Sequence, residues 1–124
     1  MVTIRNEIFT LVKQTASGVD NNSYVTAEYV LQPPSFPCIV VQEINNIPFK
    51  RATDLSHHEN LTRCEFEIDI YTDGQGKISA NKEMCEAIDM ALNNIGFQRT
   101  YYSNIPNALN PTIWRSVVRY EKII

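Results

Sequence analysis

The sequence predicts an α+β domain in which two helices pack on one face of a four-stranded antiparallel or mixed sheet. Within residues 63–72, positions 64–70 alternate strictly between apolar and acidic side chains, a period of two typical of a strand with one buried and one solvated face. Two other stretches repeat apolar residues at helical spacing, and each precedes a pair of candidate strands. The predicted order is therefore α-β-β-α-β-β.

The alternating stretch organises the rest of the prediction. Its apolar set is Cys64, Phe66, Ile68 and Ile70, and its acidic set is Glu65, Glu67 and Asp69. Three neighbouring carboxylates repel one another and need water or cations beside them. The last candidate strand carries Arg115 and Arg119 on one parity. We expect the two strands to pair antiparallel with arginines opposite acids, each exposed pair contributing about 0.2–1 kcal/mol.

Length and composition fit one globular domain over residues 1–124, with 44% hydrophobic and 20% charged residues. A formal charge of -3 argues against a surface that binds duplex nucleic acid, which needs clustered Lys and Arg. It suits a wall past which nucleic acid slides. The sequence shows neither a signal peptide pattern nor an apolar run of about 18–20 residues, so we expect a cytoplasmic origin and no membrane partner.

The first half of the chain begins with a helix predicted over residues 3–16, capped by Thr3 and ended by Ser17 and Gly18. Its apolar stripe is Ile4, Ile8, Leu11 and Val12. Residues 24–31 are ambiguous between a short strand at 24–26 and a helical turn at 27–30. A proline-rich extended segment then leads into a strand at 38–44, whose first residues are apolar on both parities and so are covered on both faces.

Residues 45–61 are too long for a tight hairpin, and loops beyond about 12–15 residues are usually functional or disordered. This segment mixes apolar side chains with cations and histidines, so it is a candidate for packing on a partner. A second helix is predicted over 79–95, ending at Gly96 in the left-handed conformation. Its stripe is Met84, Ala87, Ile88, Ala91 and Ile95, widened by Cys85 and Leu92. Strands at 97–102 and 112–121 follow.

No motif predicts catalysis, a metal site or a cofactor. His57, His58 and Glu59 are adjacent in an extended segment and lack HExxH spacing. The acidic side chains of the central strand lie on an open sheet face, where nothing is expected to raise a carboxyl pKa. Gly74 and Gly76 read as a strand-to-helix turn, since Walker spacing is absent. Arginine lies beside aromatic residues near Trp114, and we attribute this pattern to ordinary strand packing. We expect the tryptophan to anchor the core.

The cysteines are odd in number and contain no CxxC pair: they are Cys38, Cys64 and Cys85. We expect buried thiols outside any disulfide, in a reducing compartment. No motif makes a nucleophile of any of them.

Two other classes stay open at this point. A small-ligand-binding or enzymatic domain would use the long loop and the glycine turn, and would need a pocket with convergent polar groups. A nucleic-acid binder would show salt-sensitive affinity for DNA.

Several stretches resemble one family. They are residues 36–41 (FPCIVV), 58–71 (HENLTRCEFEIDIY), 96–100 (GFQRT), 105–107 (IPN) and 115–120 (RSVVRY). Together they are similar to the tail terminator, or minor tail and tail-completion, proteins of long-tailed bacteriophages and prophages. The likeness covers nearly the whole chain, and its motifs are structural.

This resemblance implies a structural virion protein, not an enzyme, that assembles in the host cytoplasm into a homo-oligomeric ring, expected to be a hexamer. The ring caps the tail tube and meets the head connector, while DNA passes through the lumen without specific binding. A head-closure or head–tail adaptor role is the neighbouring alternative. The candidate interface residues are Phe49, Lys50, Arg51, His57, His58, Glu59, Glu65, Glu67, Asp69, Arg115 and Arg119.

Overall fold

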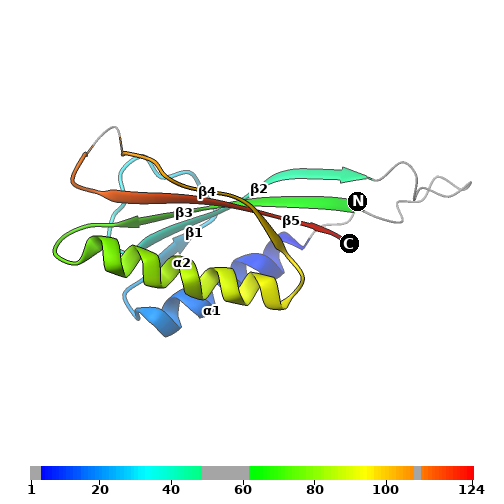
Figure 1. Cartoon of the computed structure of the whole chain (residues 1–124), viewed down its shortest axis with the longest axis horizontal. Coiled ribbons are helices and arrows are strands. Elements are labelled where there is room, and N and C mark those ends of the chain that lie inside the picture. The colour runs from blue at the N-terminus through cyan, green and yellow to red at the C-terminus, as the bar shows by residue number, and fades with distance from the viewer. Residues whose placement is uncertain (1–3, 49–61, 108–109) are drawn as a thin grey trace, which may run out of the picture.

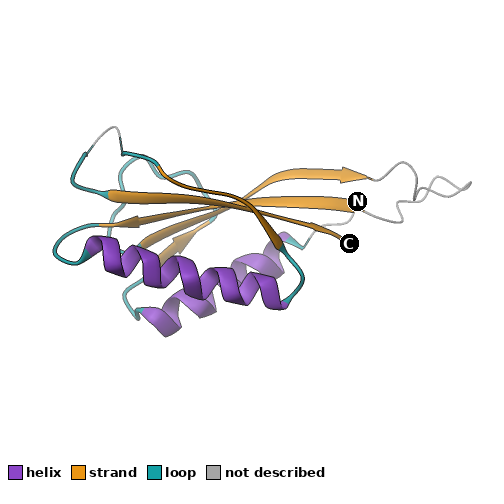
Figure 2. Ribbon diagram, in the orientation of Figure 1, coloured by secondary structure: helices purple, strands orange, loops and turns teal. Residues whose placement is uncertain are grey.

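The protein is an α+β fold in which two helices lie on one face of a five-stranded mixed sheet (Figures 1 and 2). The structure is a computed structural model that describes residues 4–48, 62–107 and 110–124. Its elements are α1 (Arg5–Val19), β1 (Tyr24–Thr26), β2 (Cys38–Pro48), β3 (Thr62–Thr72), α2 (Lys77–Asn94), β4 (Gln98–Asn104) and β5 (Trp114–Ile123). The α+β class is confirmed, and the prediction of four strands was wrong.

The fifth strand is β1, which pairs parallel with the start of β2. Of the two possibilities left open for residues 24–31, the short strand is the correct one. With β1 included, the sheet order is β1-β2-β3-β5-β4, so the predicted central strand β3 lies in the middle. It pairs antiparallel with β2 on one side and with β5 on the other. The prediction that β3 and β5 are neighbours is confirmed.

The main core lies between the helices and the sheet. The four apolar residues of β3 that were predicted to face the helices, Cys64, Phe66, Ile68 and Ile70, are each 0% exposed. Ile8 and Val12 of α1 and Ile88 of α2 pack against this layer. Burying a side chain of this size contributes about 1.5–3 kcal/mol, so this layer supplies much of the driving force for folding.

A second, smaller core lies on the opposite face, over one end of the sheet. Cys38, Val40 and Tyr71 form it together with Ile113, and Phe36 from the segment before β2 packs against them. The peptide bond between Phe36 and Pro37 is cis. The prediction that the start of β2 is covered on both faces is therefore confirmed.

Two predicted element ends were wrong. Helix α1 continues through Gly18 to Val19 because Ala16 is fully buried and its carbonyl accepts from the amide of Asp20 and the hydroxyl of Ser23. An interior glycine costs only about 1 kcal/mol, which such packing offsets. Strand β2 runs on to Pro48, past a register shift after Glu43, so residues 45–48 of the predicted loop are strand. The rest of that loop, like Thr3, lies outside the described residues.

Helix α2 ends at Asn94, one residue before the predicted end, and Gly96 has the predicted left-handed conformation with a φ of 93°. The amide of Phe97 donates to the carbonyl of Leu92, which satisfies one of the last helical acceptors. Ile95 was predicted to be buried, but it is 39% exposed because it comes after the last helical residue. Trp114 was predicted to anchor the core, but it is only half-buried at the start of β5.

Candidate interface on the sheet

The predicted polar residues of β3 and β5 lie on the sheet face opposite the helices. We call Glu65, Glu67, Asp69, Arg115 and Arg119 the charged face. Residues that lie directly opposite each other on paired strands point to the same side of the sheet. Glu67 lies opposite Arg119 and Asp69 lies opposite Val117, so the odd-numbered residues of both strands share this face. The other predicted interface residues, Phe49, Lys50, Arg51, His57, His58 and Glu59, lie outside the described residues.

The pair at the centre of the charged face is Glu67 and Arg119. The Nε of Arg119 donates to Oε1 of Glu67 at 3.1 Å, and its guanidinium lies 5.2 Å from the ring centroid of Tyr101 on β4. The Arg119 side chain is 48% exposed, so the pair contributes at most about 1 kcal/mol. Its main effect is to hold β3, β5 and β4 in one register.

Glu65 is bound differently from the prediction, because neither Arg115 nor Arg119 reaches it. Its register partner on β5 is Glu121. Glu65 instead forms an ion pair with Arg63 on its own strand at 3.4 Å and accepts a hydrogen bond from Asn45 on β2 at 3.1 Å. Side chains of the same face thus satisfy this carboxylate without a ligand.

Asp69 departs most from the prediction of a solvated acid. It is only 5% exposed, because the second core packs over its end of the sheet. Arg115 binds it diagonally through a hydrogen bond of 2.7 Å to Oδ2, while Arg115 itself faces Tyr71 in the register. Oδ1 of Asp69 and Nε of Arg115 are buried and have no hydrogen-bond partner among the described residues.

This burial changes the acidity of Asp69. Desolvation raises the pKa of Asp69 above its ordinary value, and the hydrogen bond and charge of Arg115 only partly oppose it. Burial and the Asp69 charge also raise the pKa of the Tyr71 hydroxyl to about 12. The expectation that nothing on this face raises a carboxyl pKa was therefore wrong. The pKa of Asp69 is raised because the segment before β2 covers this end of the sheet.

The raised pKa of Asp69 predicts a pH dependence of stability. Below its ordinary pKa of 3.8 both folded and unfolded chains hold the proton. As the pH rises, the unfolded chain releases the Asp69 proton first. The stabilisation that the protonated Asp69 contributes to the free energy of unfolding is therefore lost as the pH rises through the pKa of Asp69 in the folded protein. The free energy of unfolding of wild type, minus that of Asp69→Asn, should therefore fall as the pH rises from below 3.8. Urea unfolding at a series of pH values measures it, and a flat or rising difference would contradict it.

A buried polar network on the helix side was missed by the sequence reading. Asn81 of α2 is 1% exposed, and its amide nitrogen donates to the carbonyl oxygens of Ile70 at 2.9 Å and Trp114 at 3.3 Å. The hydroxyl of Ser116 lies between the side-chain oxygens of Asn81 and Asn104. The signal was present, because Asn81 precedes Met84, Cys85 and Ile88 at helical spacing.

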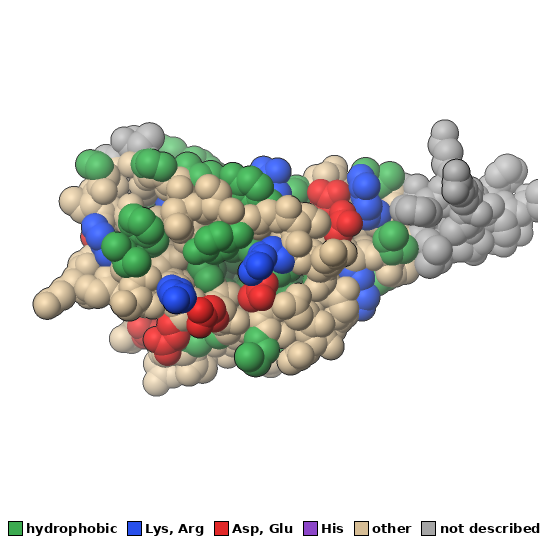
Figure 3. Space-filling model, in the orientation of Figure 1, with side chains coloured by type: hydrophobic (Ala, Val, Ile, Leu, Met, Phe, Trp, Pro, Cys, Tyr) green, Lys and Arg blue, Asp and Glu red, His purple; other side chains and the backbone are tan. Residues whose placement is uncertain are grey.

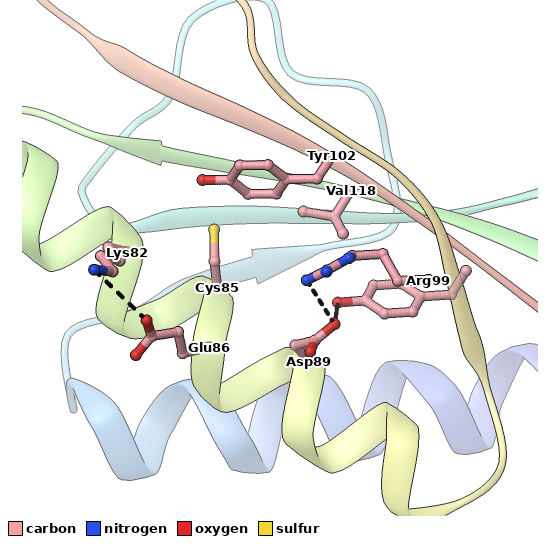
Figure 4. Close-up of a pocket in the computed structure, with 8 residues that line it drawn as sticks. Lys82, Cys85, Glu86, Asp89, Arg99, Tyr102 and Val118 are labelled. Atoms are coloured by element: carbon pink, nitrogen blue, oxygen red, sulfur yellow. Dashed lines mark hydrogen bonds and ion pairs between the residues drawn. The ribbon is translucent and has the colours of Figure 1, made fainter.

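A groove with a cavity of about 320 Å³ lies between α2 and the strands β4 and β5 (Figure 4). Its lining residues are Lys82, Cys85, Glu86, Asp89, Arg99, Tyr102, Val118 and Tyr120. Asp89 accepts a hydrogen bond from the hydroxyl of Tyr120 at 2.9 Å and pairs with Arg99 at 3.5 Å, so its charge is already balanced. Figure 4 shows Arg99 directed toward Asp89 from the strand side of the groove.

The buried cysteine thiols of this protein are poor nucleophiles. All three cysteines are buried thiols, as predicted, and Cys85 is one of the residues that line the groove. Burial raises the pKa of the Cys85 thiol to about 11 and that of Cys38 to about 11. Since the thiolate is the nucleophile, these cysteines are poorly reactive near neutral pH.

Within residues 4–48, 62–107 and 110–124, no group of three or more His, Cys, Asp or Glu side chains is placed to hold a metal ion. The helices in this part of the chain are too short or too polar to cross a membrane.

Figure 3 shows acidic and basic side chains interspersed on the face that it displays. The fold and the charged face define an α+β protein in which each carboxylate of the charged face is paired with an arginine. A scan against protein-family models and a search of curated proteins both find no match for this chain.

Proposed function

We propose that this protein is a structural phage or prophage protein, not an enzyme, whose copies form a ring that caps the tail tube and joins it to the head connector. The observation that carries the proposal is the charged face, on which Glu67 pairs with Arg119 and Glu65 with Arg63. These groups are spread along the strands and bind one another, whereas a ligand site needs polar groups that converge on one point. Such a surface suits contact with other protein subunits.

In the proposed ring, which we expect to be a hexamer of the virion, DNA passes through the lumen without specific binding. Arginines held by carboxylates attract phosphates less than unpaired cations do. The whole chain also carries a formal charge of -3, which opposes adhesion of nucleic acid. The partners of the ring would be the tail tube protein on one side and the head-closure or connector protein on the other.

Glu67→Lys should leave the fold intact and change assembly. The substitution removes the Arg119 pair and places like charges opposite each other, which costs about 1 kcal/mol in stability. Circular dichroism should show a native fold, while light scattering and electron microscopy should show loss of the rings that wild type forms. Glu83→Lys is the control, since Glu83 is an exposed acid on α2. Unfolding of the Glu67→Lys monomer would contradict the placement of this face.

The same assay tests the proposal as a whole. Wild type should assemble as its concentration rises and should sediment with purified tail tubes. Binding to the connector without binding to tubes would favour the head-closure or adaptor role. A wild-type chain that stays monomeric at high concentration and ignores both partners would overturn the ring proposal.

The groove between α2 and β4 is the observation that favours the second candidate, a small-ligand-binding domain. At about 320 Å³ it lies at the lower limit of the pockets that hold small molecules. A compound that raises the melting temperature of wild type but not of Arg99→Ala would support this function over the structural one.

A further inference from the structure

The charges that line the groove between α2 and β4 balance one another. Two of its lining residues, Lys82 and Arg99, are cations and two, Glu86 and Asp89, are acids, so their formal charges cancel. Arg99 pairs with Asp89 at 3.5 Å, and Lys82 pairs with Glu86 at 4.0 Å, where both side chains are largely exposed. A charged ligand would lose water on entering the groove and would find no unpaired counterion among these residues.

The polar atoms that line the groove also have protein partners. Oδ1 of Asp89 accepts a hydrogen bond from the hydroxyl of Tyr120 at 2.9 Å, and its Oδ2 accepts one from the side-chain amide of Asn93 at 3.1 Å. The Cys85 thiol donates to Oδ1 of Asn81 at 3.3 Å. Since these groups are already bonded, they leave little capacity for a ligand that needs several hydrogen bonds. Recognition in this groove therefore depends on apolar contact.

Two aromatic rings and a sulfur atom supply apolar surface to the groove. Tyr102 is 46% exposed and lies opposite the core residue Val118 in the register, so its ring projects to the helix side of β4. Figure 4 shows Sγ of Cys85 pointing from α2 toward the Tyr102 ring. The side chain of Tyr120 also lines the groove. Aromatic rings and sulfur attract a further aromatic ring beyond the effect of burial alone.

The volume of the groove suits one ring or two fused rings. An apolar cavity of about 150 Å³ inside a protein binds benzene. The groove, at about 320 Å³, offers roughly twice that space. A compound of the size of indole or naphthalene therefore fits it.

We propose that the groove binds a small uncharged aromatic compound of one or two rings, which packs against Tyr102 and Cys85. The proposal rests on the second candidate function above, small-ligand binding, and names the class of ligand. It is independent of ring assembly, because the groove lies on the helix side of the sheet and the charged face lies on the other side.

Three compounds that share the indole ring test the charge of the ligand. Indole is uncharged, indole-3-acetate is an anion and tryptamine is a cation at neutral pH. Indole at ten times its dissociation constant should raise the melting temperature of wild type by about 5 °C. The two charged analogues should bind about tenfold more weakly in calorimetric titrations. Phenol should bind more tightly than cyclohexanol, because only phenol has an aromatic ring.

Tyr102→Ala and Tyr101→Ala test the position of the ligand. The two tyrosines are adjacent in β4 and similarly exposed, but Tyr101 lies opposite Arg119 on the other face of the sheet. Tyr102→Ala should weaken indole binding about tenfold, and Tyr101→Ala should leave it unchanged. Circular dichroism should show that both variants fold. In wild type, the NMR shifts that indole induces should be confined to residues 82–89, 99–102 and 118–120.

The outcomes separate the ligand class from the function on which it rests. A charged analogue that binds in the groove more tightly than indole, or cyclohexanol binding as tightly as phenol, would overturn the ligand class while small-ligand binding stands. NMR shifts outside the groove, or equal losses of affinity in the two tyrosine variants, would overturn the groove as the site. If none of these compounds bound, both the proposal and the second candidate function would be contradicted.

Discussion

Ile68→Asp is expected to unfold the protein. Ile68 is 0% exposed at the centre of β3, directly opposite Val41 on one side and Val118 on the other. A carboxylate placed there loses its water and gains no partner of opposite charge within this apolar layer. The expected loss is about 4 kcal/mol or more, a large share of the 5–15 kcal/mol typical of a folded domain.

Far-UV circular dichroism and urea unfolding measure this effect. Ile68→Val is the matched control, because it removes a single methylene and should cost about 0.5–1.5 kcal/mol. A native spectrum of Ile68→Asp, with an unfolding midpoint close to that of wild type, would contradict the assignment of the buried face of β3.

Asn81→Ala is the second substitution with a large expected effect. Asn81 bridges α2 to β3 and β5, because its amide donates to the carbonyls of Ile70 and Trp114 and its oxygen lies against the Ser116 hydroxyl. Removing the amide leaves buried polar groups with fewer partners and opens a small cavity. The expected loss is about 2–4 kcal/mol, since each buried group left unsatisfied costs about 1–3 kcal/mol.

The control is Asn94→Ala, which changes an exposed asparagine at the end of the same helix and should shift stability by about 0.5 kcal/mol or less. A double-mutant cycle with Ser116→Ala should give a coupling energy of about 0.5–3 kcal/mol, as expected for residues in one network. Equal unfolding midpoints for Asn81→Ala and Asn94→Ala would show that the network contributes no stability.

Strand β3 shows what a local sequence pattern can predict. Strict alternation over residues 64–70 identified the face that packs on the helices, because side chains of a strand point to opposite sides in turn. Complementary charges then identified β5 as its neighbour, and the pair of Glu67 with Arg119 is present. These inferences need only properties of residues close together in the sequence, or of two strands taken as a pair.

Other features were wrong or missed for a common reason. Asp69 was expected in water, but residues from before β2 and after β4 build a second core over it. The three residues of β1 are too few to show a period, and they become a strand only through pairing with β2. The role of Asn81 was missed, because its partners are backbone carbonyls that no sequence pattern displays.

The sequence by itself therefore determined the α+β class, the buried face of the central strand and the pairing of that strand with β5. Only the tertiary structure decided which acid is buried, which edges of the sheet are open and where the groove beside α2 lies. The physical reason is the separation in sequence over which each property is set. Periodicity shows only whether a residue of a helix or strand faces the apolar core or the solvent. Burial of a charge, by contrast, depends on segments that are distant in the chain and meet only when it folds.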